Sequence, residues 1–187
     1  MPSTLVQIEN LKKHYSLRGH FLRREKRVVH AVDGVSFNIL EGETFGLVGE
    51  SGCGKTTLGR LAVRLVEPTA GTVCFAGKDI FRMDKAELGS ARRQMQIIFQ
   101  DPYASLNPRK SVHSILSQPF TIHQELQREQ IESKVLELLE HVGLTPPESF
   151  VDRFPHEFSG GQRQRIGIAR AVALRPRFIV ADEPVSA

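Results

Sequence analysis

The chain has 187 residues, of which 40% are hydrophobic and 25% are charged, a composition that indicates a folded domain and excludes an intrinsically disordered chain. Its formal net charge is +4, and residues 18–27 alone contain five basic residues and one acidic residue. The remainder of the chain is therefore neutral overall, which argues against a protein that binds nucleic acid over a broad surface. We expect the basic stretch from Arg18 to Arg27 to be a solvated loop, with a contact to an anionic lipid surface or a partner protein as the alternative.

The sequence also bears on where the protein works. No apolar run approaches the ~20 residues that are needed to span a bilayer. The segment Met1–Gln7 lacks the apolar core of a signal peptide. The two cysteines, one of them inside a glycine-rich loop, indicate a reducing compartment and no disulfide framework. We therefore expect the chain to stay in the cytoplasm.

The first half of the chain is expected to form strands and one helix. Alternating apolar residues predict a half-buried strand over Leu5–Leu11 and one or two further strands within Val28–Ile39. A short apolar strand is expected over Thr44–Val48, a helix over Thr57–Leu65 and a hairpin strand over Thr72–Gly77.

A complete G-x-x-x-x-G-K-[ST] phosphate loop occupies Gly49–Thr56, between the predicted strand and the predicted helix. Its glycines allow successive backbone N–H groups to turn toward a polyphosphate at the positive end of the helix. Lys55 would contact the β- and γ-phosphates, and the Thr56 hydroxyl would bind Mg²⁺. The alternative is a glycine-rich turn with a helix cap and no ligand. The residues expected to contact nucleotide here are Gly49, Ser51, Gly52, Cys53, Gly54, Lys55, Thr56 and Thr57.

The second half is expected to be mostly helical, between two short apolar strands. An apolar stripe at helical spacing should pack in the core, and it consists of Ile131, Val135, Leu138, Leu139 and Val142. The predicted elements are a helix over Lys85–Arg93, a buried strand over Gln96–Gln100, a turn-rich loop from Asp101 to Pro108, helices to about Phe158, a helix over Gln162–Leu174 and a strand over Arg177–Ala181.

Two acidic residues, Asp182 and Glu183, follow the last apolar strand, where a nucleotide-binding sheet presents its ligand-facing edge. Asp182 is the candidate for holding Mg²⁺, and Glu183 is the candidate general base for the attacking water. Such a pair alone is often only a solvated strand end, and the phosphate loop upstream favours the catalytic interpretation.

A second phosphate site is expected at Ser159-Gly160-Gly161-Gln162. Ser159 and Gln162 form a capping box for the helix that follows, which accounts for these two residues structurally. A cap does not require two consecutive glycines, whereas glycines expose backbone N–H groups to an anion at a helix N-terminus.

Together these residues resemble a known family. Phe158–Gln162, followed by Arg163-Gln164-Arg165, resembles the signature motif of the ATP-binding subunits of ABC transporters. The order of motifs is also that of the family, with Gln100 in the place of the Q-loop glutamine. The segments Asp101–Arg109 and Phe154–Phe158 are similar to those of oligopeptide and dipeptide importers, and importers of nickel and glutathione look alike.

The resemblance implies an α/β fold with a P-loop NTPase core, an N-terminal antiparallel β subdomain and an inserted α-helical subdomain, incomplete at the C-terminus. Residues 1–187 would form one partial ATP-binding domain. Its parts would be the β subdomain and core over about 1–100, the helical subdomain over about 101–160, and the signature helix and Walker B strand over about 161–187.

The resemblance also implies roles for residues. Two such subunits, identical or related, would enclose two ATP molecules, and Ser159, Gly160, Gly161 and Gln162 of one would contact the ATP of the other. Mg²⁺ would be bound by Thr56, Gln100 and Asp182. Tyr15 would stack on adenine, with a buried core tyrosine as the alternative. The expected partners are ATP, permease subunits and, indirectly, a solute-binding protein, at the cytoplasmic face of the membrane, with no nucleic acid.

The sequence departs from the family at its end, because Val185-Ser186-Ala187 corresponds to the start of a loop that family members continue into a further strand and a histidine. We therefore expect an N-terminal fragment of a longer subunit that binds nucleotide weakly and hydrolyses it negligibly, while its parent is a competent ATPase. The competing interpretations are a soluble ABC-type ATPase that acts on DNA or ribosomes and a non-catalytic nucleotide-binding module.

Overall fold

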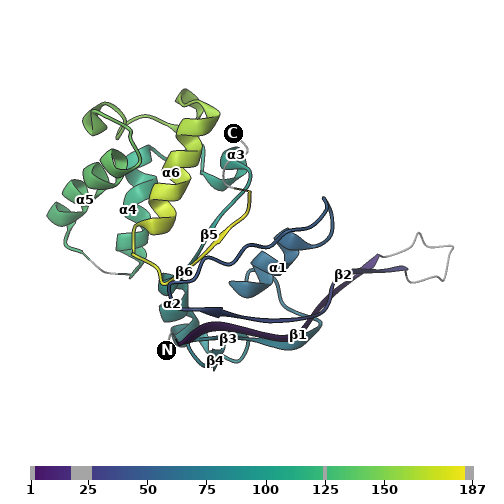
Figure 1. Ribbon diagram of the computed structural model, residues 1–187. Coiled ribbons are helices and arrows are strands. Elements are labelled where there is room, and N and C mark those ends of the chain that lie inside the picture. The colour runs from purple at the N-terminus through teal and green to yellow at the C-terminus, as the bar shows by residue number, and fades with distance from the viewer. Residues whose placement is uncertain (1–2, 18–26, 124–125, 184–187) are drawn as a thin grey trace. The chain divides into compact units, whose positions relative to one another are not determined.

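A computed structural model describes residues 3–17, 27–123 and 126–183 of the chain (Figure 1). The chain divides into two compact units, residues 1–92 and residues 93–187. Most of the basic stretch that was expected to form a loop, residues 18–26, lies outside the described residues. Among the helices that the structure describes, none is both long and apolar enough to span a bilayer.

The first unit is built on an antiparallel sheet with the strand order β2-β1-β3-β4 (Figure 1). Alternating side chains of β1 face the core, and Val6 pairs with Phe75 while Ile8 pairs with Val73, all four of them buried. This alternation is the pattern that predicted the strand over Leu5–Leu11. The strands are β1 (Thr4–Leu17), β2 (Arg27–Leu40), β3 (Ala70–Phe75) and β4 (Lys78–Asp79), and the helices are α1 (Lys55–Ala62) and the start of α2 (Lys85–Gln94).

The β1–β2 hairpin is longer than the sequence predicted, because β1 runs on to Leu17. This outer part has no single buried face, and Tyr15, Val28 and Val29 are all exposed, so it lacks the alternation that marks a half-buried strand. The register shifts where Lys13 pairs with Val32 while the next residue pairs with His30, which leaves one extra residue on β2. That extra residue is Ala31, and it forms a β-bulge.

The predicted strand over Thr44–Val48 is not formed, and this prediction is wrong. Val48 is 95% exposed, and Phe45 instead stacks on Phe37 with 4.7 Å between ring centroids. A strand exists only where a neighbour completes its ladder of hydrogen bonds. Within the described part of the chain no segment pairs with Thr44–Val48. An apolar sequence alone is therefore not sufficient to form a strand here.

The second unit combines a parallel pair of strands with a helical core. Strands β5 (Met95–Ile98) and β6 (Phe178–Ala181) pair in register from Met95 with Phe178 to Ile98 with Ala181. The predicted apolar stripe is confirmed, because Val135, Leu138 and Leu139 are buried in the helical core. The helices are α3 (Pro102–Ser105), α4 (Val112–His123), α5 (Arg128–His141), η1 (Pro147–Ser149), η2 (Pro155–Glu157) and α6 (Gly160–Val172).

Candidate nucleotide-binding site

The phosphate loop begins helix α1 through Gly54, whose backbone has φ 101° and ψ 4°. A Cβ atom at this position would lie 2.1 Å from the carbonyl oxygen of Ala31, the bulged residue of β2. Both the left-handed backbone and the close approach therefore require glycine here. The second glycine of the motif thus serves a packing need of this fold, in addition to the expected exposure of backbone N–H groups to phosphate.

The Lys55 side chain folds back onto the first residues of the phosphate loop. Its ammonium group donates to the carbonyl oxygens of Gly49 at 2.7 Å and Glu50 at 2.9 Å, and lies 4.0 Å from the sulfur of Cys53. These contacts hold the positive charge over the loop, where the γ-phosphate of a bound nucleotide is expected. A Cβ at Gly49 would stand 2.6 Å from the Cys53 sulfur, so the first glycine of the motif is also restricted in space.

The remaining residues of the loop are open to a ligand. Ser51, Gly52 and Cys53 are exposed, and Gly52 has φ 80°. Thr56 and Thr57 are half-buried in the first turn of α1. The backbone of the loop therefore has the exposure and the helix N-terminus that an anion site needs.

Tyr15 lies on β1 opposite Val29 and is 40% exposed, so the alternative of a buried core tyrosine is wrong. The ammonium group of Lys13 stands 4.9 Å from the centroid of its ring. The ring is accessible for stacking, as the adenine assignment requires.

In the second unit Gln100 and Glu183 meet just beyond the carboxyl ends of the parallel strands β5 and β6. The Gln100 amide donates to a Glu183 carboxylate oxygen at 2.5 Å. The pairing of the strands continues one residue further, with a bond of 3.0 Å from the Asp182 amide to the carbonyl of Ile98. The structure therefore brings Gln100, Asp182 and Glu183 to one edge of a sheet.

Glu183 is also held in a left-handed backbone conformation, with φ 46°. A non-glycine residue pays a conformational cost there, and such residues concentrate at functional sites. Nothing in the sequence signals this backbone conformation, since glutamate has no preference for the left-handed region.

The Ser159–Gln162 capping box is confirmed. The Ser159 hydroxyl accepts from the Gln162 amide at 3.3 Å, and the Gln162 side chain accepts from the Ser159 amide at 3.0 Å. A Cβ atom at Gly160 or Gly161 would meet nothing within 4 Å. The cap accounts for Ser159 and Gln162, whereas packing among the described residues does not account for the two glycines.

Sequence reasoning missed a link between the segment after Gln100 and helix α6. The buried guanidinium of Arg163 lies 3.8 Å from the ring centroid of Tyr103 on α3, and its Nε donates to the carbonyl of Pro155 at 2.5 Å. Arg170 of α6 donates to the carbonyl of Ser105 at 2.7 Å. The sequence predicts a turn-rich loop over this segment, whereas the structure has the short helix α3 there. The Asp101-Pro102 pair was the missed signal, since Asp101 caps α3 and proline occupies its first turn.

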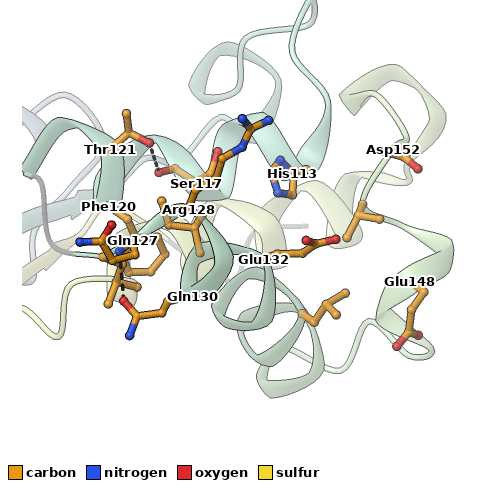
Figure 2. Close-up of a pocket in the computed structure, with 14 residues that line it drawn as sticks. His113, Ser117, Phe120, Thr121, Gln127, Arg128, Gln130, Glu132, Glu148 and Asp152 are labelled. Carbon is orange, nitrogen blue, oxygen red and sulfur yellow. Dashed lines mark hydrogen bonds between the residues drawn. The ribbon is translucent and has the colours of Figure 1, made fainter.

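An open groove in the helical part of the second unit is distinct from these motifs. Figure 2 shows its lining from α4, α5 and the segment around Glu148 and Asp152. Thr121 donates to the carbonyl of Ser117 at 3.1 Å, and the Gln130 side chain accepts from the Gln127 amide at 3.0 Å. None of its lining residues belongs to a phosphate, signature or Walker B motif.

The comparison with known families decides the identification. Residues 32–186 match the ABC transporter family. The chain belongs to this family. The oligopeptide transport ATP-binding protein AppF of Bacillus subtilis is 52% identical over 185 residues, which are 98% of this chain and 56% of that protein. The dipeptide transport ATP-binding protein DppF of Escherichia coli is 49% identical over 183 residues, 98% of this chain and 54% of that protein.

Solved structures of ABC proteins share the fold. A dimeric ATP-binding cassette in a post-hydrolysis state bound to ADP and Pi superposes with a TM-score of 0.84 at 31% identity, over 98% of this chain and 75% of that one. The expected ABC-type α/β fold is therefore confirmed. The chain spans a little over half the length of the curated ABC relatives described above.

Proposed function

We propose that the chain is the ATP-binding part of a subunit that hydrolyses ATP to power the import of oligopeptides or dipeptides through an ABC transporter. The observation that carries the hydrolytic role is the hydrogen bond between Gln100 and Glu183 at the carboxyl edge of β5 and β6. The peptide substrate class rests on the names of the relatives, which are 49% to 52% identical over nearly the whole chain.

The chemistry assigned to the chain is the attack of water on the γ-phosphate of ATP. Lys55 and the backbone of the phosphate loop would bind the β- and γ-phosphates and balance the charge that develops there. Glu183 would accept a proton from the attacking water, while Gln100 orients both the carboxylate and the water. The bond to ADP breaks as the bond to the water oxygen forms, which yields ADP and inorganic phosphate.

Mg²⁺ fits the residues that are available. Thr56, Gln100 and Asp182 provide hydroxyl, amide and carboxylate oxygens, the ligand type that Mg²⁺ prefers. The ion would supply charge neutralisation on the phosphates. In this assignment Thr56 and Asp182 bind it, and Gln100 contacts it from the end of β5.

The signature residues are assigned to the ATP of a second subunit. Ser159 is exposed, and Gly160 and Gly161 have open space where a Cβ would stand, so their N–H groups can receive an anion from outside the chain. A solved cassette of the same fold is dimeric. We assign the whole protein to a peripheral position on the cytoplasmic face of the membrane, with permease subunits and, through them, a solute-binding protein as partners.

The test is ATP turnover by the whole protein that contains this chain, with and without its permease in liposomes. Glu183→Gln is expected to lower turnover by about 100-fold or more and to leave nucleotide binding intact, whereas Lys55→Ala is expected to weaken binding itself. Glu140→Gln, an exposed substitution on α5, is the matched control and should behave as wild type.

Unchanged turnover in Glu183→Gln would contradict the catalytic assignment. Turnover that responds to nucleic acid and not to the peptide-loaded permease would contradict the transport assignment while leaving the ATPase assignment in place.

A further inference from the structure

Two histidines and an aspartate meet on the β1–β2 hairpin of the first unit, outside every motif that the proposed function uses. His14 pairs directly with His30 across the strands, and their ring centroids are 3.9 Å apart. The Nε2 atom of His14 lies 3.2 Å from one carboxylate oxygen of Asp33, and the Nδ1 atom of His30 lies 3.3 Å from the other. One ligand atom from each residue lies within 4.8 Å of the others.

These three side chains are close enough to share one metal ion. Zinc binds imidazole nitrogen and carboxylate oxygen at about 2.0 to 2.2 Å, so neighbouring ligand atoms of a tetrahedral site stand roughly 3.4 Å apart. Each imidazole nitrogen lies close to this distance from a different oxygen of Asp33, at 3.2 and 3.3 Å. Small rotations of these exposed side chains would bring both nitrogens and one oxygen, which already lie within 4.8 Å of one another, around a single ion. Two imidazoles and one carboxylate are also a ligand set that suits divalent transition metals.

We propose that His14, His30 and Asp33 bind a divalent transition-metal ion of the Zn²⁺ type, with water completing its coordination. The side chains are 23%, 53% and 48% exposed, which gives the ion and a water ligand access from solvent. The two histidines lie on different strands, so the ion would join β1 to β2 near the outer part of the hairpin.

Lys12 makes the proposal sharply testable, because it competes for the same carboxylate. Its ammonium group lies 3.3 Å from the Asp33 oxygen that also faces His14. A bound metal ion has to displace this ammonium group, since two cations repel at that distance. Removing the lysine charge is therefore expected to strengthen metal binding. If Asp33, Lys12 and the histidines formed only ion pairs and no metal site, the same change would weaken the cluster.

The site adjoins the bulge that supports the phosphate loop. The bulged residue Ala31 follows His30, and its carbonyl packs against Gly54 so closely that a Cβ would stand 2.1 Å away. A metal ion bound by His14 and His30 would restrain the bulge, and with it the backbone on which the phosphate loop rests.

The test is a titration of the full chain with Zn²⁺ in competition with a chromophoric chelator, without nucleotide. His14→Ala, His30→Ala and Asp33→Asn should each weaken Zn²⁺ binding by at least about tenfold, since even partners outside the ligand shell contribute 10- to 100-fold. Lys12→Met should strengthen it. Zinc should also raise the melting temperature of the wild-type chain and not that of the His14→Ala/His30→Ala double variant.

Two controls address other zinc ligands and misfolding. His123 lies in the second unit, so His123→Ala should bind Zn²⁺ as the wild type does. A Cys53→Ser/Cys74→Ser double variant should also bind Zn²⁺ as the wild type does, because neither thiol belongs to the site. Circular dichroism establishes that each variant is folded. Absence of zinc binding by the wild-type chain, equal binding by the double-histidine variant, or weaker binding by Lys12→Met would each overturn the proposal.

Discussion

The side-chain amide of Gln100 donates a 2.5 Å hydrogen bond to the carboxylate of Glu183, which joins residues 83 positions apart in sequence. The bond is made possible by the parallel pairing of β5 with β6, since the two residues follow the carboxyl ends of neighbouring strands. Because an amide both donates to the carboxylate and has an oxygen left to accept, Gln100 can orient Glu183 and a water molecule together.

Two substitutions of Gln100 distinguish the loss of its hydrogen bond to Glu183 from the effect of a negative charge beside Glu183. Gln100→Ala should lower ATP turnover by about 10-fold or more, because Glu183 loses its hydrogen-bond donor while nucleotide binding is retained. Gln100→Glu should lower turnover further, since two carboxylates would then face each other at hydrogen-bond distance. Steady-state turnover and fluorescent-nucleotide binding measure the two effects. Wild-type turnover in Gln100→Ala would remove Gln100 from the mechanism.

Gly54 and Gly89 should respond to alanine in opposite directions. Gly54→Ala should lower the free energy of unfolding by about 2 kcal/mol or more and abolish nucleotide binding, because its φ is 101° and the Ala31 carbonyl leaves no room. Gly89 lies inside α2 with nothing within 4 Å of an added Cβ, so Gly89→Ala should raise stability by roughly 0.5 to 1 kcal/mol. Urea denaturation of both variants measures the difference. Equal effects at the two positions would contradict the packing argument for Gly54.

What the sequence predicted well depends on local pattern. The apolar stripe of α5 and the alternation in β1 report burial directly, so Val135 and Ile8 were placed in the core correctly. The phosphate loop, the signature and the Asp182-Glu183 pair were found because each is contiguous in sequence. The local sequence around each motif also predicts whether it lies at the start of a helix or at the end of a strand.

The features that the sequence did not predict depend on distant partners. Thr44–Val48 is apolar enough for a strand, but a strand needs a neighbour that sequence pattern does not identify. The outer hairpin beyond His14 is exposed and has no buried face. The contacts of Arg163 with Tyr103 and of Gln100 with Glu183 join segments that are 60 and 83 residues apart, and neither residue type signals such a partner by itself.

Gly161 provides a test in which stability and function should diverge. Gly161 lies in the first turn of α6, and an added Cβ would meet no atom of the described residues within 4 Å. Stability of Gly161→Ala should therefore be unchanged or rise by up to about 1 kcal/mol. If Gly161 contacts the ATP of a second subunit, the added methyl group should still prevent ATP-dependent dimerisation. Light scattering in the Glu183→Gln background, with and without ATP, measures this. A variant that dimerises as the parent does would contradict the assignment in trans.

Glu137 gives a prediction for acid stability. A hydrogen bond from Lys134, with an Nζ–Oε2 distance of 2.6 Å, lowers the pKa of Glu137 below its ordinary value. A carboxyl whose pKa is lower in the folded state stabilises above its unfolded pKa of roughly 4.3, and this contribution is lost as the pH falls through the folded value. The wild-type chain should therefore exceed Glu137→Gln in stability at pH 7 and converge with it in acid. Glu140→Gln on the same helix is the control, and a difference that persists at pH 2 would contradict the argument.

Arg163 should matter for stability more than its aromatic partner. Its guanidinium is buried and donates to the carbonyls of Pro155 and His156, so Arg163→Met leaves these acceptors without their charged donor and should lower the free energy of unfolding by about 2 kcal/mol. Tyr103 is 65% exposed, so Tyr103→Ala should cost only about 0.5 to 1 kcal/mol, and Tyr103→Phe should cost almost nothing because the ring face is kept.

The same variants test whether the contact of α3 with α6, the helix that follows the signature residues, couples the permease to ATP hydrolysis. Tyr103→Ala removes the aromatic contact between α3 and α6 with little loss of stability, so a fall in peptide-stimulated turnover without a fall in basal turnover would assign a coupling role to it. Tyr103→Phe should retain both activities. If Tyr103→Ala and Tyr103→Phe have equal stimulated turnover, the contact with Arg163 contributes to packing alone.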